Sequence, residues 1–266
     1  MLALICGQGA LPTLIVQNCS IRPLVASLTQ FQPDELIPDI NFRLENLGVF
    51  LTLLKQRGIT KVCFAGCIRR PDINPSLIDG PTKPLVSRIL EAQAKGDDGA
   101  LRIIIEIFEQ AGFAVIGSQE IVPNLLPSVG ILTKRKPSPQ DHKDVMRAAE
   151  VIMGMSHLDI GQACAVAWGQ VLAVEVYSGT EWMLNSLVER SYSWPLGGLL
   201  FKAPKGTQDR RVDLPSIGLK TCKQAKDAGL NGIVIAHDGV LVLDVADVIA
   251  EANRLDLFLW VCEYPF

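Results

Sequence analysis

Charged side chains gather in one short segment of this 266-residue chain, between residues 202 and 215. The segment holds four cations, two carboxylates and an amide, which in chain order are Lys202, Lys205, Gln208, Asp209, Arg210, Arg211 and Asp213. Phosphoryl transfer uses this mixture, because cations neutralise charge on phosphate oxygens and a carboxylate holds a divalent metal or activates water. A solvated charged loop is the alternative. Because prolines and a glycine also restrict this segment, we favour a functional site.

A second candidate site is the glycine turn at residues 7–12, which follows a short apolar run. Gly7 and Gly9 permit close approach of the backbone, and the start of the next helix offers free N–H groups to an anion such as a nucleotide phosphate. The third glycine of a dinucleotide-binding motif would fall at position 12, which is Pro12. NAD binding is therefore disfavoured, and a tight strand-to-helix turn remains the structural alternative.

Two further strings of polar residues are candidate ligand sites. Arg69 and Arg70 follow an apolar run, where they suit bidentate contact with phosphate or, alternatively, lie as solvated surface residues. Asp97 and Asp98 offer oxygens to a hard cation, but we favour one of them as a helix N-cap. The three histidines have no ligand spacing, so the sequence gives no support to His-based catalysis.

Alternating apolar patterns predict the elements that position these residues in the first half. Strands are expected near 2–6, 25–28, 62–65 and 113–116, and helical patterns near 11–19, 42–58, 85–95 and 98–111. A β-α-β-α-β order predicts a parallel sheet, so this half is expected to form half of a doubly wound fold.

A polar, proline-rich stretch at 130–139 interrupts this pattern, as is typical of a domain boundary. We therefore predict an α/β protein: an N-terminal Rossmann-like parallel-sheet domain at 1–130, a linker at 131–139, and a second, mixed α/β domain with the catalytic segment at 140–266. Strands of this second domain are expected near 163–168, 171–176, 199–203, 232–236, 240–243 and 257–261.

Composition excludes several classes of protein. With 25 basic and 28 acidic residues, the chain lacks the basic excess of a nucleic-acid-binding protein. Seven cysteines without a Cys-x-x-Cys pair argue against a disulfide framework and favour a reducing cytoplasm. No signal peptide or apolar run long enough to span a membrane is seen, so any membrane contact is expected to be peripheral.

Taken together, several motifs resemble one family along the whole chain. They are Gly7-x-Gly9-x-Leu11-Pro12, Gly66-x-x-Arg69-Arg70-Pro71, Gly96-Asp97-Asp98, Asp159-x-Gly161-Gln162 and Lys202-Ala203-Pro204-Lys205-x-x-Gln208-Asp209-x-Arg211-Val212-Asp213-Leu214-Pro215. The chain is similar to the UDP-2,3-diacylglucosamine pyrophosphatases of lipid A biosynthesis, in the two-domain form unrelated to metallophosphoesterases.

The resemblance implies hydrolysis of UDP-2,3-diacylglucosamine to the diacylated sugar 1-phosphate and UMP. Water would attack the α-phosphorus with the help of a divalent cation, usually Mg²⁺. The lipid substrate implies a cytoplasmic protein that is peripheral to the inner membrane.

The family's essential aspartate corresponds to Asp213, whose role as metal ligand, activator of water or both stays open. The chemistry of the segment predicts Lys202, Lys205 and Arg211 as catalytic phosphate contacts, and Asp209 as a second metal ligand. Predicted substrate-binding residues are Gly7, Gly9, Leu11, Pro12, Arg69, Arg70, Gln162, Thr180 and Gln208.

Two departures from the family pattern put secondary contacts in doubt. Cys67 stands where a lysine is expected, and Ser178-Gly179-Thr180-Glu181 stands where Glu-Gly-Thr-Asp is expected. Two other functions stay open: a nucleotide-dependent oxidoreductase or sugar-nucleotide modifier, and a non-catalytic lipid or nucleotide carrier. The first lacks an acidic residue after the strand at 25–28, and the second predicts binding without turnover.

Overall fold

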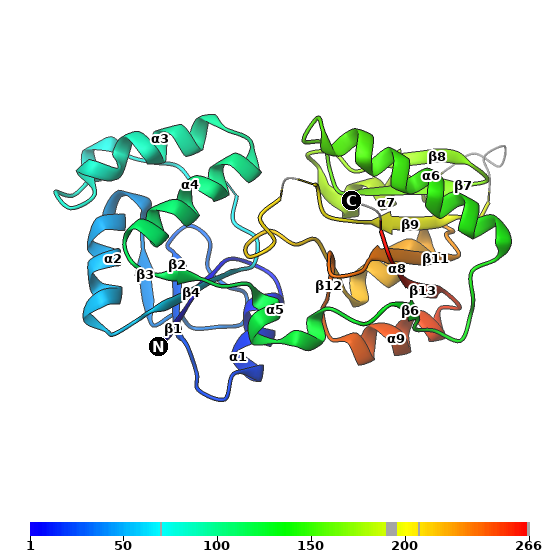
Figure 1. Cartoon of the computed structure of the whole chain (residues 1–266), viewed down its shortest axis with the longest axis horizontal. Coiled ribbons are helices and arrows are strands. Elements are labelled where there is room, and N and C mark those ends of the chain that lie inside the picture. The colour runs from blue at the N-terminus through cyan, green and yellow to red at the C-terminus, as the bar shows by residue number, and fades with distance from the viewer. Residues whose placement is uncertain (70, 190–195, 207, 265–266) are drawn as a thin grey trace. The chain divides into compact units, whose positions relative to one another are not determined.

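The computed structural model describes residues 1–69, 71–189, 196–206 and 208–264, with only the backbone of Asp97 and Asp98. By its contacts the chain divides into two compact units (Figure 1). Unit 1 comprises Met1–Pro123 and Asp209–Asp213, and unit 2 comprises Asn124–Gln208 and Leu214–Phe266. The charged segment predicted as a site is therefore divided between the two units.

The described strands of unit 1 form a wholly parallel sheet in the order β3-β2-β1-β4-β5. They are β1 (Leu2–Cys6), β2 (Leu24–Leu28), β3 (Ile40–Phe42), β4 (Lys61–Ala65) and β5 (Ala114–Val115). This topology confirms the predicted Rossmann-like sheet. Phe42 was expected to begin a helical face, but it ends β3, a strand too short to be recognised from its sequence.

Helices cover both faces of the sheet in unit 1. They are α1 (Leu11–Asn18), α2 (Leu47–Gln56), α3 (Val86–Ala94), α4 (Asp97–Gln110) and α5 (Ser118–Ile121), with 3-10 turns η1 (Leu44–Asn46), η2 (Pro75–Leu77), η3 (Lys83–Leu85) and, across the boundary of the units, η4 (Pro123–Leu125). Ala3, Ile5 and Val62 point to one face, where α2, α3 and α4 complete an apolar core. Because both faces are covered, the strands are almost wholly apolar.

Unit 2 contains a mixed sheet, whose described strands run in the order β6-β13-β11-β9-β7-β8. Its strands are β6 (Gly130–Ile131), β7 (Ala163–Ala167), β8 (Gln170–Val174), β9 (Leu199–Lys202), β11 (Gly232–Ala236) and β13 (Phe258–Cys262). β9, β11 and β13 are parallel, whereas β6 and β7 run antiparallel to their neighbours. The predicted second, mixed α/β domain is thus confirmed as a fold class.

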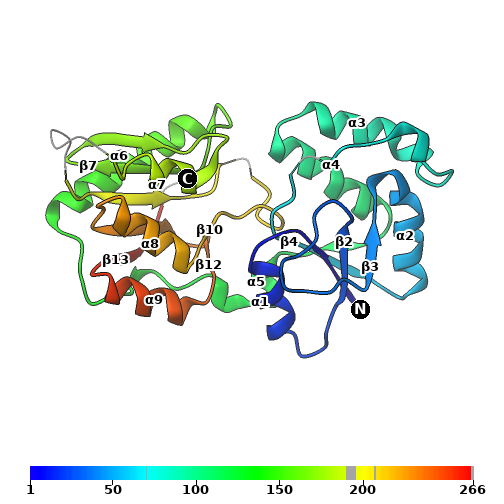
Figure 2. The ribbon, with the colours of Figure 1, turned by 180° about the vertical axis from the view of Figure 1, so that it is seen from behind.

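The sheet of unit 2 lies between two layers of helices, α6 (Pro139–Ser156) on one face and α7 (Gly179–Asn185), α8 (Leu219–Asp227) and α9 (Val245–Arg254) on the other. A short parallel pair, β10 (Ser216–Ile217) and β12 (Leu241–Val242), lies beside α8 (Figure 2). In β9, Leu200 packs with the α7–α9 layer and Phe201 packs with α6. This alternation directs the next side chain, Lys202, toward the α7 face.

The boundary between the units lies earlier than the predicted linker at 131–139. Ile131 pairs with Trp260 in the sheet of unit 2, and α6 begins at Pro139. The Ser138 hydroxyl accepts a hydrogen bond from the Asp141 N–H at 3.2 Å, so the polar residues of this stretch cap a helix. Among the described residues, no helix is both long and apolar enough to span a membrane.

Candidate functional site

The glycine turn of unit 1 packs its backbone against the loop that follows β4. The Gly7 N–H donates to the Ala65 carbonyl at 2.8 Å, and Gln8 and Cys67 exchange backbone hydrogen bonds of 2.8 and 2.9 Å. A Cβ at Gly7 would lie 2.4 Å from the Cys67 carbonyl oxygen. Gly7 therefore permits two loops of the protein to meet, which is a structural reason for glycine at this position.

Gly9 lies differently, with a φ of +100° and open space where a Cβ would be. Its N–H donates to the Asp34 carboxylate at 2.8 Å, so a protein carboxylate holds the group that was predicted to meet a phosphate. Leu11 begins α1 and is half-buried, and Pro12 is buried in its first turn. Asp34 was not anticipated as the partner of this turn.

The structure shows no contacts that would define a ligand site at the other predicted residues within Met1–Pro123 that it describes. Arg69 is exposed in the loop after β4. Arg70 and the side chains of Asp97 and Asp98 lie outside what the structure describes. The N-cap of α4 is Gly96, so the helix begins one residue earlier than an Asp97 cap would require and two residues earlier than an Asp98 cap would require.

Arg211 is held by two carboxylates within unit 1. Its Nε and Nη2 donate to the Asp209 carboxylate at 3.0 and 2.7 Å, and its Nη1 donates to Glu109 of α4 at 2.6 Å. The hydrogen bonds from Arg211 lower the pKa of the Asp209 carboxyl, against burial. The bonds to both carboxylates raise the pKa of Arg211. Val212 packs on the apolar core of the same unit. Arg211 thus ties the segment that carries Asp213 to α4.

Lys202 is the most deeply buried cation of the predicted site, with 6% of its surface exposed. It ends β9, and its Nζ donates to the Thr180 hydroxyl at 2.7 Å. That hydroxyl in turn donates to the Glu175 carboxylate at 2.9 Å. Burial lowers the pKa of the Lys202 ammonium, while the charge of Glu175 raises it. Thr180, which is predicted to bind the substrate, connects a buried cation to a buried carboxylate.

The register of β7 and β9 brings Lys202, Thr180 and Glu175 together. Ala163 of β7 pairs with Lys202 of β9, so residues just before β7 lie beside the carboxyl end of β9. The Glu175 N–H also donates to the Ala163 carbonyl at 2.8 Å. Gly161 has a φ of +48°, and a Cβ there would lie 2.0 Å from the Glu175 carbonyl oxygen. Glycine is therefore required at position 161, because any side chain there would clash with the backbone of Glu175.

A second polar group continues from the same edge of the sheet. Lys205 Nζ contacts the Asp159 carboxylate at 2.6 Å, and the Lys205 N–H donates to the Gln208 side chain at 3.0 Å. Gln208 donates to the Gln162 side chain at 3.4 Å, and the Ala203 N–H donates to the Gln162 carbonyl at 3.0 Å. The structure thus brings Lys202, Lys205, Gln162, Thr180 and Gln208 together in unit 2.

Two members of this cluster, Glu175 and Asp159, were missed as site residues. Glu175 follows a strand directly and precedes Thr180 by five residues, and Asp159 lies three residues before Gln162. Both signals were visible in the sequence, but the antiparallel register that brings them to Lys202 and Lys205 was not. With two cations and two carboxylates, the cluster carries its own counter-charges.

The carboxylates of the motif, Asp209 and Asp213, are the predicted ligands of a divalent cation. Both oxygens of Asp209 are engaged by Arg211, and no group of three or more His, Cys, Asp or Glu side chains suited to a metal occurs among the described residues. Asp213, half-buried in unit 1, is the other carboxylate of the motif. Because Mg²⁺ is often held by one or two carboxylates plus substrate phosphates, this donor set fits a cation that enters with a phosphorylated ligand.

Comparison with known proteins covers nearly the whole chain. The model of the LpxI N-terminal domain matches residues 1–125, and the model of the LpxI C-terminal domain matches residues 128–260. The UDP-2,3-diacylglucosamine pyrophosphatase LpxI of Caulobacter vibrioides is 36% identical over an alignment of 268 positions that covers 97% of this chain and 96% of that protein.

Proposed function

The chain belongs to the LpxI family, and we infer that it hydrolyses UDP-2,3-diacylglucosamine, the compound named for its Caulobacter vibrioides relative. The products are UMP and 2,3-diacylglucosamine 1-phosphate. Water adds to the α-phosphorus, the bond to the bridging oxygen breaks, and its electron pair leaves with the sugar 1-phosphate. The observation that best supports a site for this chemistry is the buried Lys202 ammonium at the carboxyl end of β9.

Lys202 is suited to stabilise a leaving phosphate. Among the described residues its ammonium group donates to Thr180, and two further N–H donors remain for phosphate oxygens. A cation in a water-poor site interacts more strongly with developing charge than one in water. We assign Lys202 to the pyrophosphate of the substrate, with Thr180 and Glu175 as positioning residues.

Lys205 is assigned to the same pyrophosphate. Its ion pair with Asp159 is partly exposed on the carboxylate side, so an anionic substrate can compete for the ammonium group. Gln208 and Gln162 hold the backbone around Lys205 and bond to each other. Arg211, which two carboxylates already hold, is assigned to positioning the segment of Asp213 rather than to phosphate contact.

Asp213 is the carboxylate that we assign to the attacking water or to a divalent cation. As a base it accepts the proton that water loses on attack. As a ligand it would hold Mg²⁺ together with phosphate oxygens of the substrate, and such a cation withdraws charge from those oxygens. The acyl chains of the substrate place it in a lipid layer, so we propose that the protein acts at the cytoplasmic face of the inner membrane.

The test is release of UMP from UDP-2,3-diacylglucosamine by the purified protein. We expect turnover with Mg²⁺, and we expect its loss with EDTA and in the Asp213→Ala variant. Turnover that survives Asp213→Ala would move the catalytic carboxylate elsewhere. Tight binding of the substrate without turnover would instead favour a carrier.

A further inference from the structure

An apolar pocket lies in unit 1, and none of the residues assigned above is part of its lining. The loop after β4 and helix α3 form most of it, and its lining is Leu44, Glu45, Ile73, Pro75, Ile78, Thr82, Val86, Ile89 and Leu90. The space measures about 380 Å³, part of it open to solvent. Leu44 follows β3 and Ile73 follows β4, so the pocket lies at the carboxyl edge of the parallel sheet, where such folds bind ligands.

The polar groups of this lining are already engaged by the protein. The buried Glu45 carboxylate accepts hydrogen bonds from Arg43 at 3.0 Å and from the Asn74 N–H at 2.8 Å. Burial opposes ionisation of Glu45, but these hydrogen bonds outweigh it and lower its pKa. The Thr82 hydroxyl accepts from the Gly48 N–H at 2.8 Å. The pocket therefore offers hydrocarbon surface, which suits an apolar ligand better than water.

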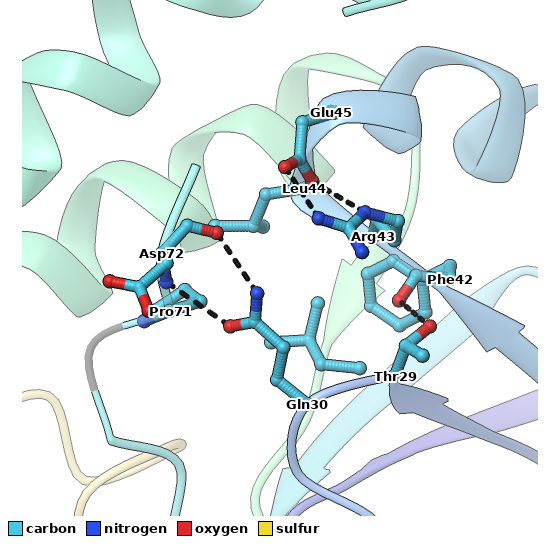
Figure 3. A pocket seen from close by; sticks show the side chains of 9 residues that line it. Thr29, Gln30, Phe42, Arg43, Leu44, Glu45, Pro71 and Asp72 are labelled. Carbon is cyan, nitrogen blue, oxygen red and sulfur yellow. Dashed lines mark hydrogen bonds and ion pairs between the residues drawn. The ribbon is translucent and has the colours of Figure 1, made fainter. Parts of the chain in front are cut away.

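A polar pocket adjoins the apolar one and shares Leu44 and Glu45 with it. Figure 3 shows the guanidinium of Arg43 among its lining side chains, with Gln30 bonded to the backbone of Asp72. The bonds from Arg43 to Glu45 use Nε and Nη2, so Nη1 remains as a donor among the described residues. A ligand that fits both pockets is amphipathic, with a hydrocarbon chain next to a hydrogen-bond acceptor.

We propose that the apolar pocket binds one acyl chain of the substrate, with the carbonyl end of that chain beside Arg43. The proposal rests on the proposed function, because UDP-2,3-diacylglucosamine supplies two such chains. Leu90, 53% exposed, lies at the rim of the pocket, and Ile89, 4% exposed, lies deep in it. An acyl chain entering past Leu90 would lose water from each methylene, worth about fourfold in affinity per group.

The experiment combines a variant that fills the pocket with substrates whose acyl chains differ in length. Val86→Phe places a larger side chain of helix α3 in the lining. Leu77→Phe, in the loop after β4, makes a similar enlargement outside the lining at a residue 48% exposed, and it is the control. UMP release is measured with the di-tetradecanoyl and the di-butanoyl substrates. We expect Val86→Phe to raise the KM of the long-chain substrate about tenfold or more, with the KM of the short-chain substrate changed less than about twofold.

A direct binding measurement separates this proposal from the proposed function. Fluorescence of cis-parinaric acid should saturate with the wild-type protein and with Leu77→Phe, and Val86→Phe should weaken that binding about tenfold. If no UMP is released but the fatty acid binds and Val86→Phe weakens that binding, the proposed hydrolase activity is contradicted and the acyl-binding pocket is supported. Equal KM changes for the long and short chains, or fatty-acid binding insensitive to Val86→Phe, would overturn the acyl site.

Discussion

The two units hold the charged groups of the 202–213 segment in different ways. In unit 1 the loops after β1 and β4 meet backbone to backbone at Gly7, and the Arg211 guanidinium is surrounded by Asp209 and Glu109. In unit 2 the Lys202 ammonium is buried, with one hydroxyl as its partner among the described residues. The same short motif thus supplies a structural tether to one unit and a buried cation to the other.

This difference shows why charge alone does not identify a phosphate site. Arg211 and Lys202 lie nine residues apart and looked equivalent in the sequence. An arginine with two carboxylate partners must give up strong charge-assisted bonds before it can meet an anion. A buried lysine held by a neutral hydroxyl gains stabilisation when an anion arrives, because burial has weakened its charged form.

The largest effect is expected from removing the buried cation. Lys202→Met keeps the apolar stem but cannot stabilise the leaving phosphate, so kcat for UMP release should fall about 10²–10³-fold. The matched control is Lys220→Met, which removes a lysine 71% exposed on α8 and should leave kcat within about twofold. A Lys202→Met enzyme that turns over like wild type would refute the assignment of Lys202.

Glycine substitutions should separate the two roles of the turn in unit 1. Gly7→Ala forces a Cβ against the Cys67 carbonyl and should lower the free energy of unfolding by about 1–3 kcal/mol. Gly9→Ala meets no neighbour and should cost about 1 kcal/mol through its positive φ alone. Urea denaturation measures both values. A larger loss for Gly9→Ala would show that loop contact is not the reason for Gly7.

The hydroxyl between Lys202 and Glu175 offers a conservative pair of variants. Thr180→Val breaks both hydrogen bonds while keeping the shape, so we expect about a tenfold loss of kcat. Thr180→Ser keeps the hydroxyl and should restore most of the activity. If Val and Ser variants lose activity equally, the methyl group of Thr180 matters and the hydrogen-bonded chain does not.

The pH dependence should report the burial of Lys202. Loss of the proton of the Lys202 ammonium should make kcat/KM decline as pH rises. Because burial lowers the pKa of this ammonium, the decline should begin at a lower pH than it would for an exposed lysine. Glu175 raises that pKa, so Glu175→Gln should move the decline to still lower pH. A decline that moves upward in Glu175→Gln, or that persists in Lys202→Met, would assign it to another group.

Much of the fold followed from periodicity, because the strands of both units are apolar runs bounded by glycine or polar residues. β3 and β6, with three and two residues, are too short to carry a recognisable pattern. The stretch predicted as a linker at 131–139 contains Ser138, the N-cap of α6. The division of the 202–213 segment between the units depends on tertiary contacts of Arg211 and Val212, which no local pattern encodes.

Lys202, rather than Arg211, is the cation that we assign to the pyrophosphate of the substrate. The most direct measurement is calorimetric binding of UDP, which carries that pyrophosphate, to the wild-type protein and to folded Lys202→Met and Arg211→Gln variants. We predict that Lys202→Met weakens binding about tenfold or more, whereas Arg211→Gln changes it less than about threefold. Weaker binding in Arg211→Gln with unchanged binding in Lys202→Met would contradict the account.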